Sequence, residues 1–150
     1  MEEKDIRFMK LALDEANLAF AEGEVPVGSV LVMSDSVITQ AHNNKEYSND
    51  PTGHAELLTL RSAAREIGNW RLSDATLYVT KEPCIMCAGA MVNARLGRLV
   101  YGCRDEKGGA VDSLYALLSD QRLNHQVEVV SGVLEEECAE ILKRFFREKR

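Results

Sequence analysis

The sequence predicts an α/β fold in which helices cover both faces of one five-stranded mixed sheet. Segments with apolar residues at steps of three and four, which favour helices, alternate with short runs rich in β-branched residues, which favour strands. The chain has 150 residues and 45% of them are hydrophobic, which suits one domain with its own core and leaves no room for a separate recognition domain. We therefore expect a single three-layer α/β/α domain over residues 1–150.

Each predicted element rests on a periodic run that turn or capping residues bound. Helices are expected over residues 5–21, 53–67, 83–94 and 134–145, with a short one over 113–118. Strands are expected over residues 27–33, 36–42, 75–80, 98–102 and 127–131. Ser34 and Asp35 join the first two strands in a hairpin, and residues 43–50 form a polar loop.

The net charge of -6 argues against a general nucleic-acid binder, because such proteins carry a basic excess. The charge is unevenly distributed, since the segment from Lys143 to Arg150 holds five cations and one anion, with Phe145 and Phe146 among them. A solvated helix end explains such a run and also suits the negative end of the helix dipole. The other interpretation is a surface where cations bind phosphates and aromatic rings stack on bases.

No stretch of the sequence predicts a secretion signal or a membrane span. The first residues lack an apolar core, and no later apolar run approaches the ~20 residues that cross a bilayer. We therefore expect a cytoplasmic protein without membrane contact, in which the four cysteines stay reduced. Cys103 and Cys138 have apolar neighbours, which indicates core residues rather than a disulfide.

Two short motifs carry the chemistry: His54-Ala55-Glu56 and, further along, Pro83-Cys84-Ile85-Met86-Cys87. One imidazole and two thiols can hold Zn²⁺ in a tetrahedral site, and three protein ligands leave the fourth position open. Glu56 would stay outside the coordination shell, where a carboxylate can transfer protons. The combination predicts a catalytic site with one zinc per chain.

The predicted elements explain the spacing of these motifs. Residues i and i+2 face nearly opposite sides of a helix, so His54 and Glu56 can address one site only from beyond a helix end. Cys84 and Cys87 share a face in the first turn of the next helix, where the positive end of the dipole favours thiolate. If the preceding strands are parallel neighbours, both helix starts meet at the carboxyl edge of the sheet.

Simpler interpretations exist for each motif taken alone. Cys-x-x-Cys also occurs in structural zinc sites, in redox pairs and among buried cysteines. Cys103 is the one obvious residue that could close a structural site. A preceding proline and a carboxylate at the right offset favour the catalytic interpretation.

The sequence resembles the bacterial tRNA-specific adenosine deaminases of the cytidine/deoxycytidylate deaminase superfamily. The resemblance covers nearly the whole chain and rests on these segments: residues 24–28, Asn43, residues 50–56, 74–80, 82–90 and 102–107, and Asn124-His125. It implies a cytidine-deaminase-like fold and a zinc-dependent hydrolase that edits RNA, converting the wobble adenosine of a tRNA anticodon to inosine. The implied partners are a tRNA anticodon stem-loop and a second copy of the chain in a homodimer.

The resemblance also implies roles for particular residues. The zinc ligands are His54, Cys84 and Cys87, and Glu56 is the general acid and base. The implied nucleoside pocket contains Asn43, Glu24, Val25 and Pro26, and the implied neighbour of the RNA backbone is Asp105. Further candidate RNA contacts come from the basic segments, at Lys107, Phe145, Phe146 and Arg147. A simpler role for Asn43 is that of a turn residue, and His42 and His125 are expected to be structural.

Three positions depart from the family pattern. Gly53 stands where alanine is usual, Lys81 where an apolar residue is usual, and Asp112 where glycine is common. None is a predicted zinc ligand. Asp112 adds an anion beside the segment expected to contact RNA, so its expected effect is on substrate affinity rather than on chemistry.

Three functions stay open at this point. The first is the editing of a tRNA anticodon, and the second is deamination of a free base or nucleoside such as guanine or cytidine. The third is a non-catalytic, zinc-stabilised RNA-binding module. Glu56 argues against the third, because a structural zinc site has no use for an unliganded carboxylate. The basic, phenylalanine-containing terminus argues against the second, because a small substrate needs no such surface.

Overall fold

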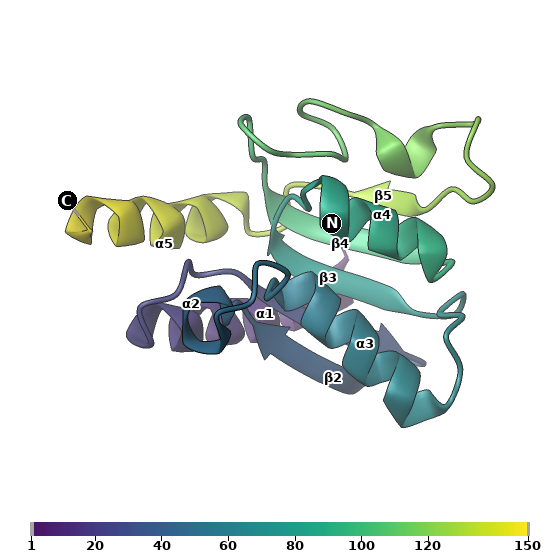
Figure 1. Ribbon diagram of the computed structural model, residues 1–150, viewed down its shortest axis with the longest axis horizontal. Helices are drawn as coiled ribbons and strands as arrows, with labels where there is room; N and C mark the ends of the chain where they lie inside the picture. Colours follow the sequence, from purple (N-terminus) through teal and green to yellow (C-terminus); the bar gives the residue numbers. More distant parts are fainter. Residues whose placement is uncertain (1, 150) are drawn as a thin grey trace.

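The chain folds around one sheet of five strands with helices on both faces, as a computed structural model of residues 2–149 shows (Figure 1). The strands are β1 (Gly28–Met33), β2 (Ser36–His42), β3 (Thr76–Lys81), β4 (Arg98–Cys103) and β5 (Glu128–Val130), in the spatial order β2-β1-β3-β4-β5. β1 is antiparallel to both of its neighbours, whereas β3, β4 and β5 are parallel. The predicted mixed sheet is confirmed.

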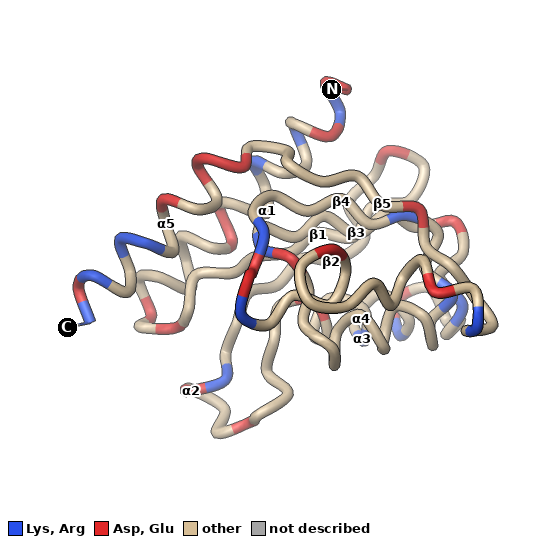
Figure 2. Tube along the Cα trace, turned by 90° about the horizontal axis from the view of Figure 1, so that it is seen from above, with Lys and Arg blue, Asp and Glu red and all other residues tan. Residues whose placement is uncertain are grey.

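Two long helices cover each face of this sheet. The view from above separates α1 (Glu3–Ala21) and α5 (Glu135–Glu148) on one face from α3 (Ala55–Ile67) and α4 (Ile85–Asn93) on the other (Figure 2). α5 extends beyond the edge of the sheet, on the side where the short helix α2 (Lys45–Ser48) lies (Figure 1). A 3-10 helix, η1 (Leu117–Ser119), packs against α4.

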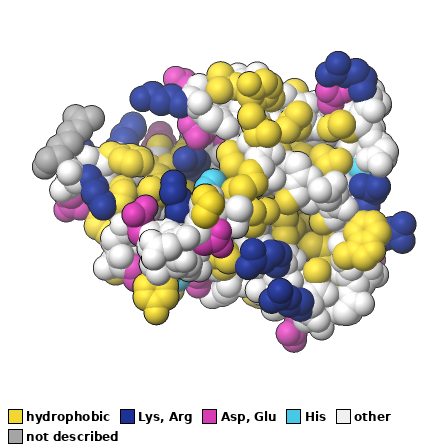
Figure 3. Space-filling model, viewed as in Figure 1, with side chains coloured by type: hydrophobic (Ala, Val, Ile, Leu, Met, Phe, Trp, Pro, Cys, Tyr) yellow, Lys and Arg dark blue, Asp and Glu magenta, His cyan; other side chains and the backbone are white. Residues whose placement is uncertain are grey.

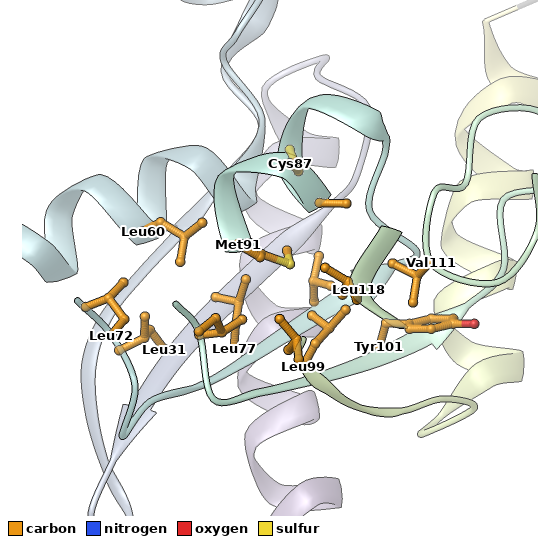
Figure 4. Packing of buried hydrophobic residues seen from close by; sticks show 14 of the residues in the cluster. Leu31, Leu60, Leu72, Leu77, Cys87, Met91, Leu99, Tyr101, Val111 and Leu118 are labelled. Carbon is orange, nitrogen blue, oxygen red and sulfur yellow. The ribbon is translucent and has the colours of Figure 1, made fainter. Parts of the chain in front are cut away.

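The larger core lies between the sheet and the helices α3 and α4. Leu60 of α3 and Met91 of α4 point toward Leu77 and Leu99 on the strands, and all four side chains are buried (Figure 4). A second cluster on the opposite face joins α1 and α5 to the same strands. Cys103 and Cys138 belong to that cluster as free thiols, which confirms their predicted place in the core.

A buried ion pair fixes α1 to the sheet. The Arg98 guanidinium donates to both carboxylate oxygens of Asp5, at 2.9 and 2.7 Å, and the Tyr78 hydroxyl donates to the same carboxylate at 2.7 Å. Asp5 is 2% exposed. The hydrogen bond from Arg98 is the main reason why the pKa of Asp5 lies below its ordinary value, since burial alone would raise it. The start of α1 is therefore tied to two strands far along the chain.

Most predicted elements are confirmed within one to three residues, with two exceptions. Ser34 and Asp35 both adopt positive φ, at 50° and 59°, as a two-residue hairpin requires. The predicted polar loop over residues 43–50 instead contains α2. The predicted short helix over residues 113–118 is wrong. The backbone N–H of Ser113 donates to the buried carboxylate of Glu82, and that of Leu114 donates to the backbone oxygen of Gly109, so these groups do not form helical hydrogen bonds.

Among residues 2–149, no helix is both long enough and apolar enough to cross a bilayer.

Candidate active site

The three predicted zinc ligands meet where α3 and α4 begin. His54 is the residue before α3, and Cys84 is the residue before α4, each with extended backbone dihedrals. Neither side chain caps its own helix, so both are available to a ligand. Cys87 lies in the first turn of α4 and is buried. Both helices start two residues later than predicted, at Ala55 and Ile85. His54 and Cys84 therefore lie just before the helices rather than within their first turns.

The distances between these ligand atoms fit a tetrahedral zinc ion. The sulfur atoms of Cys84 and Cys87 each lie 3.6 Å from Nδ1 of His54. Zinc bonds of about 2.3 Å to sulfur and about 2.05 Å to nitrogen, at a tetrahedral angle, separate N and S by roughly 3.6 Å. Among the described residues, these three side chains form the one metal-binding cluster of this kind. The donor set therefore fits zinc without rearrangement.

The two thiols differ sharply in acidity. A hydrogen bond with Cys87 is the largest of the effects that lower the pKa of Cys84 to about 3, and the same contact raises the pKa of Cys87. A divalent cation would bind both sulfur atoms as thiolates, because thiolate is the metal ligand, and binding would therefore release any proton that the thiols hold.

Cys103 cannot complete a closed, four-ligand site. Its side chain is buried on the α5 face of the sheet, and its thiol donates to the backbone oxygen of Thr80 at 3.5 Å. Burial raises the pKa of Cys103 to about 11, as expected for a neutral core thiol. The alternative of a structural site closed by Cys103 is therefore not supported, and the fourth position stays open.

Glu56 lies in the first turn of α3, beside the ligand cluster. It is 4% exposed, and burial is the main reason why its pKa lies above its ordinary value. A buried carboxyl group that lines the same cavity as His54 and Cys84 is placed to accept and return a proton there, as a general acid and base must.

A cavity of about 460 Å³ opens over this cluster. Figure 3 shows the hollow between α5 and the α2 segment, with cationic side chains at its edge. Its lining includes the predicted residues His54, Glu56, Cys84, Glu24, Val25, Asn43, Phe145 and Phe146. The other predicted binding residues, Pro26, Asp105, Lys107 and Arg147, lie outside the lining.

Asn43 links the cavity to the first residue of α3. Its side-chain oxygen accepts a hydrogen bond from the backbone N–H of Ala55 at 2.8 Å. This contact uses the oxygen and leaves the amide nitrogen as the group that could address a substrate. Asn43 is therefore more than the turn residue that the simpler interpretation suggested.

Glu24 lines the cavity, but its carboxylate forms hydrogen bonds with the protein backbone. Its two oxygens accept hydrogen bonds from the backbone N–H groups of Glu46 and Tyr47, at 3.0 and 2.8 Å, and the side chain is 2% exposed. N–H groups at the start of a helix have no partner within the helix, so their bonds to Glu24 explain why α2 forms within a polar segment. The sequence contains no local signal for this capping, because the donors lie more than twenty residues away.

The segment expected to approach RNA is organised by a second buried carboxylate, Glu82. Its side chain is 1% exposed. It accepts hydrogen bonds from the backbone of Asp105, Val111, Asp112 and Ser113, and from the Ser113 hydroxyl. A Cβ atom on Gly109 would lie 2.3 Å from the same carboxylate, so only glycine fits there. Sequence reasoning missed this role, since Glu82 appeared only as part of the family pattern.

On this segment Asp105 is held by contacts with the protein, whereas Lys107 is exposed to solvent. Asp105 accepts hydrogen bonds from the backbone of Lys107 and Gly108, and it forms an ion pair with Lys81 at 3.3 Å. Lys107 is exposed to solvent. Asp112, an exposed anion on the same segment, accepts a hydrogen bond from the buried Tyr101 hydroxyl, and its expected effect on substrate affinity stays a prediction.

The two phenylalanines near the C-terminus are not equivalent. Phe145 is 6% exposed and packs edge-on against Phe20 and Phe146, whereas Phe146 is 49% exposed. Phe146 is therefore the ring with free surface. Arg147 is exposed and forms an ion pair with Glu140. Arg150, the last cation of the basic run, lies outside the described residues.

The remaining histidines serve the fold, as expected. His42 forms ion pairs with Glu15 and Glu22, at 2.8 and 3.0 Å. His125 contacts the backbone oxygen of Leu96 at 2.8 Å.

Comparison with known proteins agrees with this site. A model of the MafB19-like deaminase family matches residues 3–150. The chain is 51% identical to a tRNA-specific adenosine deaminase of Bacillus subtilis over 98% of its own length and 91% of the relative. A solved structure from a study of adenosine-to-inosine editing by tRNA A34 deaminases superposes with a TM-score of 0.88 and 48% identity, covering 91% of this chain and 99% of the other.

A guanine deaminase of Bacillus subtilis is also similar, with a TM-score of 0.64 and 36% identity. That match covers 69% of this chain and 66% of the guanine deaminase, well below the coverage of the tRNA-specific enzyme. Identity near one half over nearly the full length, together with the His-Cys-Cys cluster and the buried Glu56, decides the family. The chain belongs to the tRNA-specific adenosine deaminases.

Proposed function

We propose that this protein binds one zinc ion at His54, Cys84 and Cys87 and hydrolyses the wobble adenosine of a tRNA anticodon to inosine and ammonia. The observation that carries the proposal is the open three-ligand cluster with buried Glu56 beside it, at the floor of a cavity that holds about 460 Å³. Such a site suits hydrolysis of one base that has been taken out of its stack.

The chain's own residues can supply the proton transfers. When bound, zinc would act as a Lewis acid that makes water a stronger nucleophile at neutral pH. Glu56 accepts a proton from the attacking water and delivers it to N1 of adenine, which makes C6 electrophilic. The C6–O bond forms, Glu56 takes the remaining proton from the new C6 hydroxyl and passes it to the amino group, and the C6–N bond breaks, so that ammonia leaves and C6 becomes the carbonyl of inosine. The position of Glu56, which is buried and lines the cavity beside His54 and Cys84, supports this double role.

The remaining protein groups would orient the base. The free amide nitrogen of Asn43 can donate to the nucleoside, and Val25 and Phe146 give the cavity apolar wall. An anticodon loop presents unstacked bases, so the enzyme takes in one base at little cost and gains binding energy from its neighbours.

The alternative of a free-base deaminase is favoured by one finding, the partial similarity to a guanine deaminase. A direct comparison of substrates separates the two. Ammonia release would be measured side by side on an anticodon stem-loop, guanine, cytidine and free adenosine. We expect the specificity constant for the stem-loop to exceed the others by at least ~10³, or about 4 kcal/mol of transition-state binding. Efficient turnover of guanine or cytidine with an inert stem-loop would refute the tRNA assignment.

We also propose that two copies of the chain associate through the surface that α3 and α4 form. This surface contains a shallow groove lined by Leu57, Leu60, Ala64, Trp70, Ala90 and Ala94, and Trp70 is 55% exposed. Hydrophobic side chains spread across the same face in Figure 3. Exposed apolar patches of this kind commonly mark protein interfaces.

Sedimentation of variants tests this association. Trp70→Asp should convert a dimer to a monomer, whereas Leu18→Asp should leave the dimer intact, because Leu18 is similarly exposed, at 51%, but lies on α1. A monomeric wild-type protein at micromolar concentration would contradict the proposed homodimer.

A further inference from the structure

Lys81 places a cation in the wall of the candidate active site. It is the last residue of β3, and its side chain, 30% exposed, lines the cavity together with His54 and Glu56. The resemblance to the family leads us to expect an apolar residue at this position, whereas this chain has a lysine. A partly buried ammonium loses hydration, and that cost is recovered only if the group gains an anionic or polar partner.

The one ion pair that Lys81 makes leaves part of its capacity unused. Its ammonium lies 3.3 Å from Oδ2 of Asp105, and the other carboxylate oxygen of Asp105 accepts from the backbone of Lys107 and Gly108. Asp105 is thus held in place by its own segment. A lysine ammonium has three donors, and within residues 2–149 no second protein partner contacts that of Lys81.

The surroundings of Lys81 favour an anionic ligand over a neutral one. Three carboxylates of the cavity lining, Glu24, Glu56 and Glu82, are buried, and Glu24 and Glu82 already accept hydrogen bonds from backbone N–H groups. Two further lysines, Lys45 of α2 and Lys149, line the same cavity from other sides, opposite a single exposed carboxylate at Glu46. The lining as a whole has three lysines and four glutamates, but three of the glutamates are buried, so lysines outnumber carboxylates in its solvent-accessible part.

We propose that Lys81 binds a phosphate group adjacent to the target nucleoside and thereby acts as a specificity-determining residue for a polynucleotide over a free base. The inference rests on the proposed function, because a free base or nucleoside carries no anion for this ammonium. Pairing with Asp105 cancels the negative charge that would otherwise repel the RNA backbone, and the remaining donors of Lys81 bind a phosphate oxygen by charge-assisted hydrogen bonds.

Variants of Lys81 test the contact through KM and kcat separately. Lys81→Met removes the charge but keeps the length, Lys81→Arg restores a charge, and Lys10→Met removes the same charge from an exposed position on α1. On an anticodon stem-loop, Lys81→Met should raise KM about ten-fold or more with kcat nearly unchanged, and Lys81→Arg should recover most of this loss. Free adenosine should react equally slowly with all forms.

A chemical change in the RNA identifies the contacted phosphate. Stem-loops would carry one neutral methylphosphonate linkage at a time on either side of the target adenosine. At one linkage the substitution should weaken the wild type about ten-fold and leave Lys81→Met unaffected, because both changes remove the same contact. Zinc content and melting temperature should match the wild type in every variant.

The outcomes separate this inference from the proposed function. A wild-type protein that leaves the stem-loop unreacted would refute the proposed function. An active wild type with equal KM for Lys81→Met and Lys10→Met would refute the role of Lys81 alone. If Lys81→Met fails to fold, the linkage scan on the wild type still decides, since insensitivity to every neutral linkage beside the target adenosine would also overturn the proposal.

Discussion

The side-chain oxygen of Asn43 accepts a hydrogen bond from the backbone N–H of Ala55 at 2.8 Å. Ala55 is the first residue of α3 and lies between His54 and Glu56, so this bond holds both chemical groups relative to the end of β2. One amide group thus ties the proposed nucleoside contact to the zinc ligand and the proton-transfer residue. Removing the Asn43 amide should weaken both substrate binding and zinc binding, whereas a substitution that keeps the oxygen should weaken substrate binding alone.

Two substitutions of Asn43 separate these roles. Asn43→Asp keeps an acceptor for Ala55 and loses the donor proposed to meet the nucleoside, so zinc content should stay normal while kcat/KM falls about ten-fold or more. Asn43→Ala loses both groups and should also weaken zinc retention. Metal analysis after dialysis against a chelator, together with stem-loop kinetics, measures both effects. Equal zinc loss in the two variants would show that the Ala55 contact does not support the metal site.

Substitutions in the proposed zinc site and at the proposed proton-transfer residue should have different effects on zinc content and activity. Cys87→Ala should lose zinc and stability together, because metal binding is coupled to folding. Cys103→Ala is the matched control, since it removes another buried thiol and should keep its zinc. Glu56→Gln should keep zinc and lose activity by about 10²-fold to 10⁴-fold. Zinc content, measured by elemental analysis, and deaminase activity would be compared among these variants. A zinc-free or fully active Glu56→Gln protein would contradict the role proposed for Glu56.

The buried carboxylate of Glu82 should make stability depend on pH. Burial alone would raise its pKa, but the hydrogen bonds from Ser113, Asp112 and Asp105 outweigh burial and lower the pKa from 4.5 to about 2. A group whose pKa is lower in the folded state stabilises the protein above the unfolded pKa and loses that effect as pH falls. The contribution, about 3 kcal/mol, should be complete above pH 4.5 and decline between about 4.5 and 2.

Urea unfolding at several pH values measures this linkage. The stability gap between the wild type and Glu82→Gln should be constant above pH 5 and narrow as the pH falls below 4.5. Glu66→Gln serves as the control, because Glu66 is exposed and should show no such gap. A gap that does not change with pH would mean that Glu82 has the same pKa in the folded and the unfolded protein, which would contradict the lowered pKa.

The cluster of proposed zinc ligands and the helices that position it were predictable, because short-range spacing determines them. His54 and Cys84 precede helices, and the thiols of Cys84 and Cys87 are one turn apart, so the residue pattern contains the geometry. The expectation that the strands before these helices are parallel neighbours was right about their direction and wrong about their adjacency. The strands before the two helices, β2 and β3, are not neighbours: β1 lies between them, antiparallel to both, and therefore leaves them running in the same direction.

The supporting carboxylates were not predictable, because their partners are backbone groups. Glu24 accepts hydrogen bonds from the start of α2, and Glu82 from residues 105–113. Every residue except proline offers a backbone N–H, so no residue pattern marks which segment a distant carboxylate will bind. The same limit explains the missed α2 and the wrongly predicted helix over 113–118, since both depend on these long-range contacts.

The central claim, that Glu56 and the zinc ligands convert one adenosine of an anticodon loop to inosine, is tested most directly by a position-resolved assay. Stem-loops would carry a single adenosine either at the wobble position or at another loop position, and inosine would be identified by nuclease digestion and mass spectrometry. We predict inosine at the wobble position with the wild type, little at the other positions, and none with Glu56→Gln. Equal conversion at every loop position, or inosine formed by Glu56→Gln, would contradict the account.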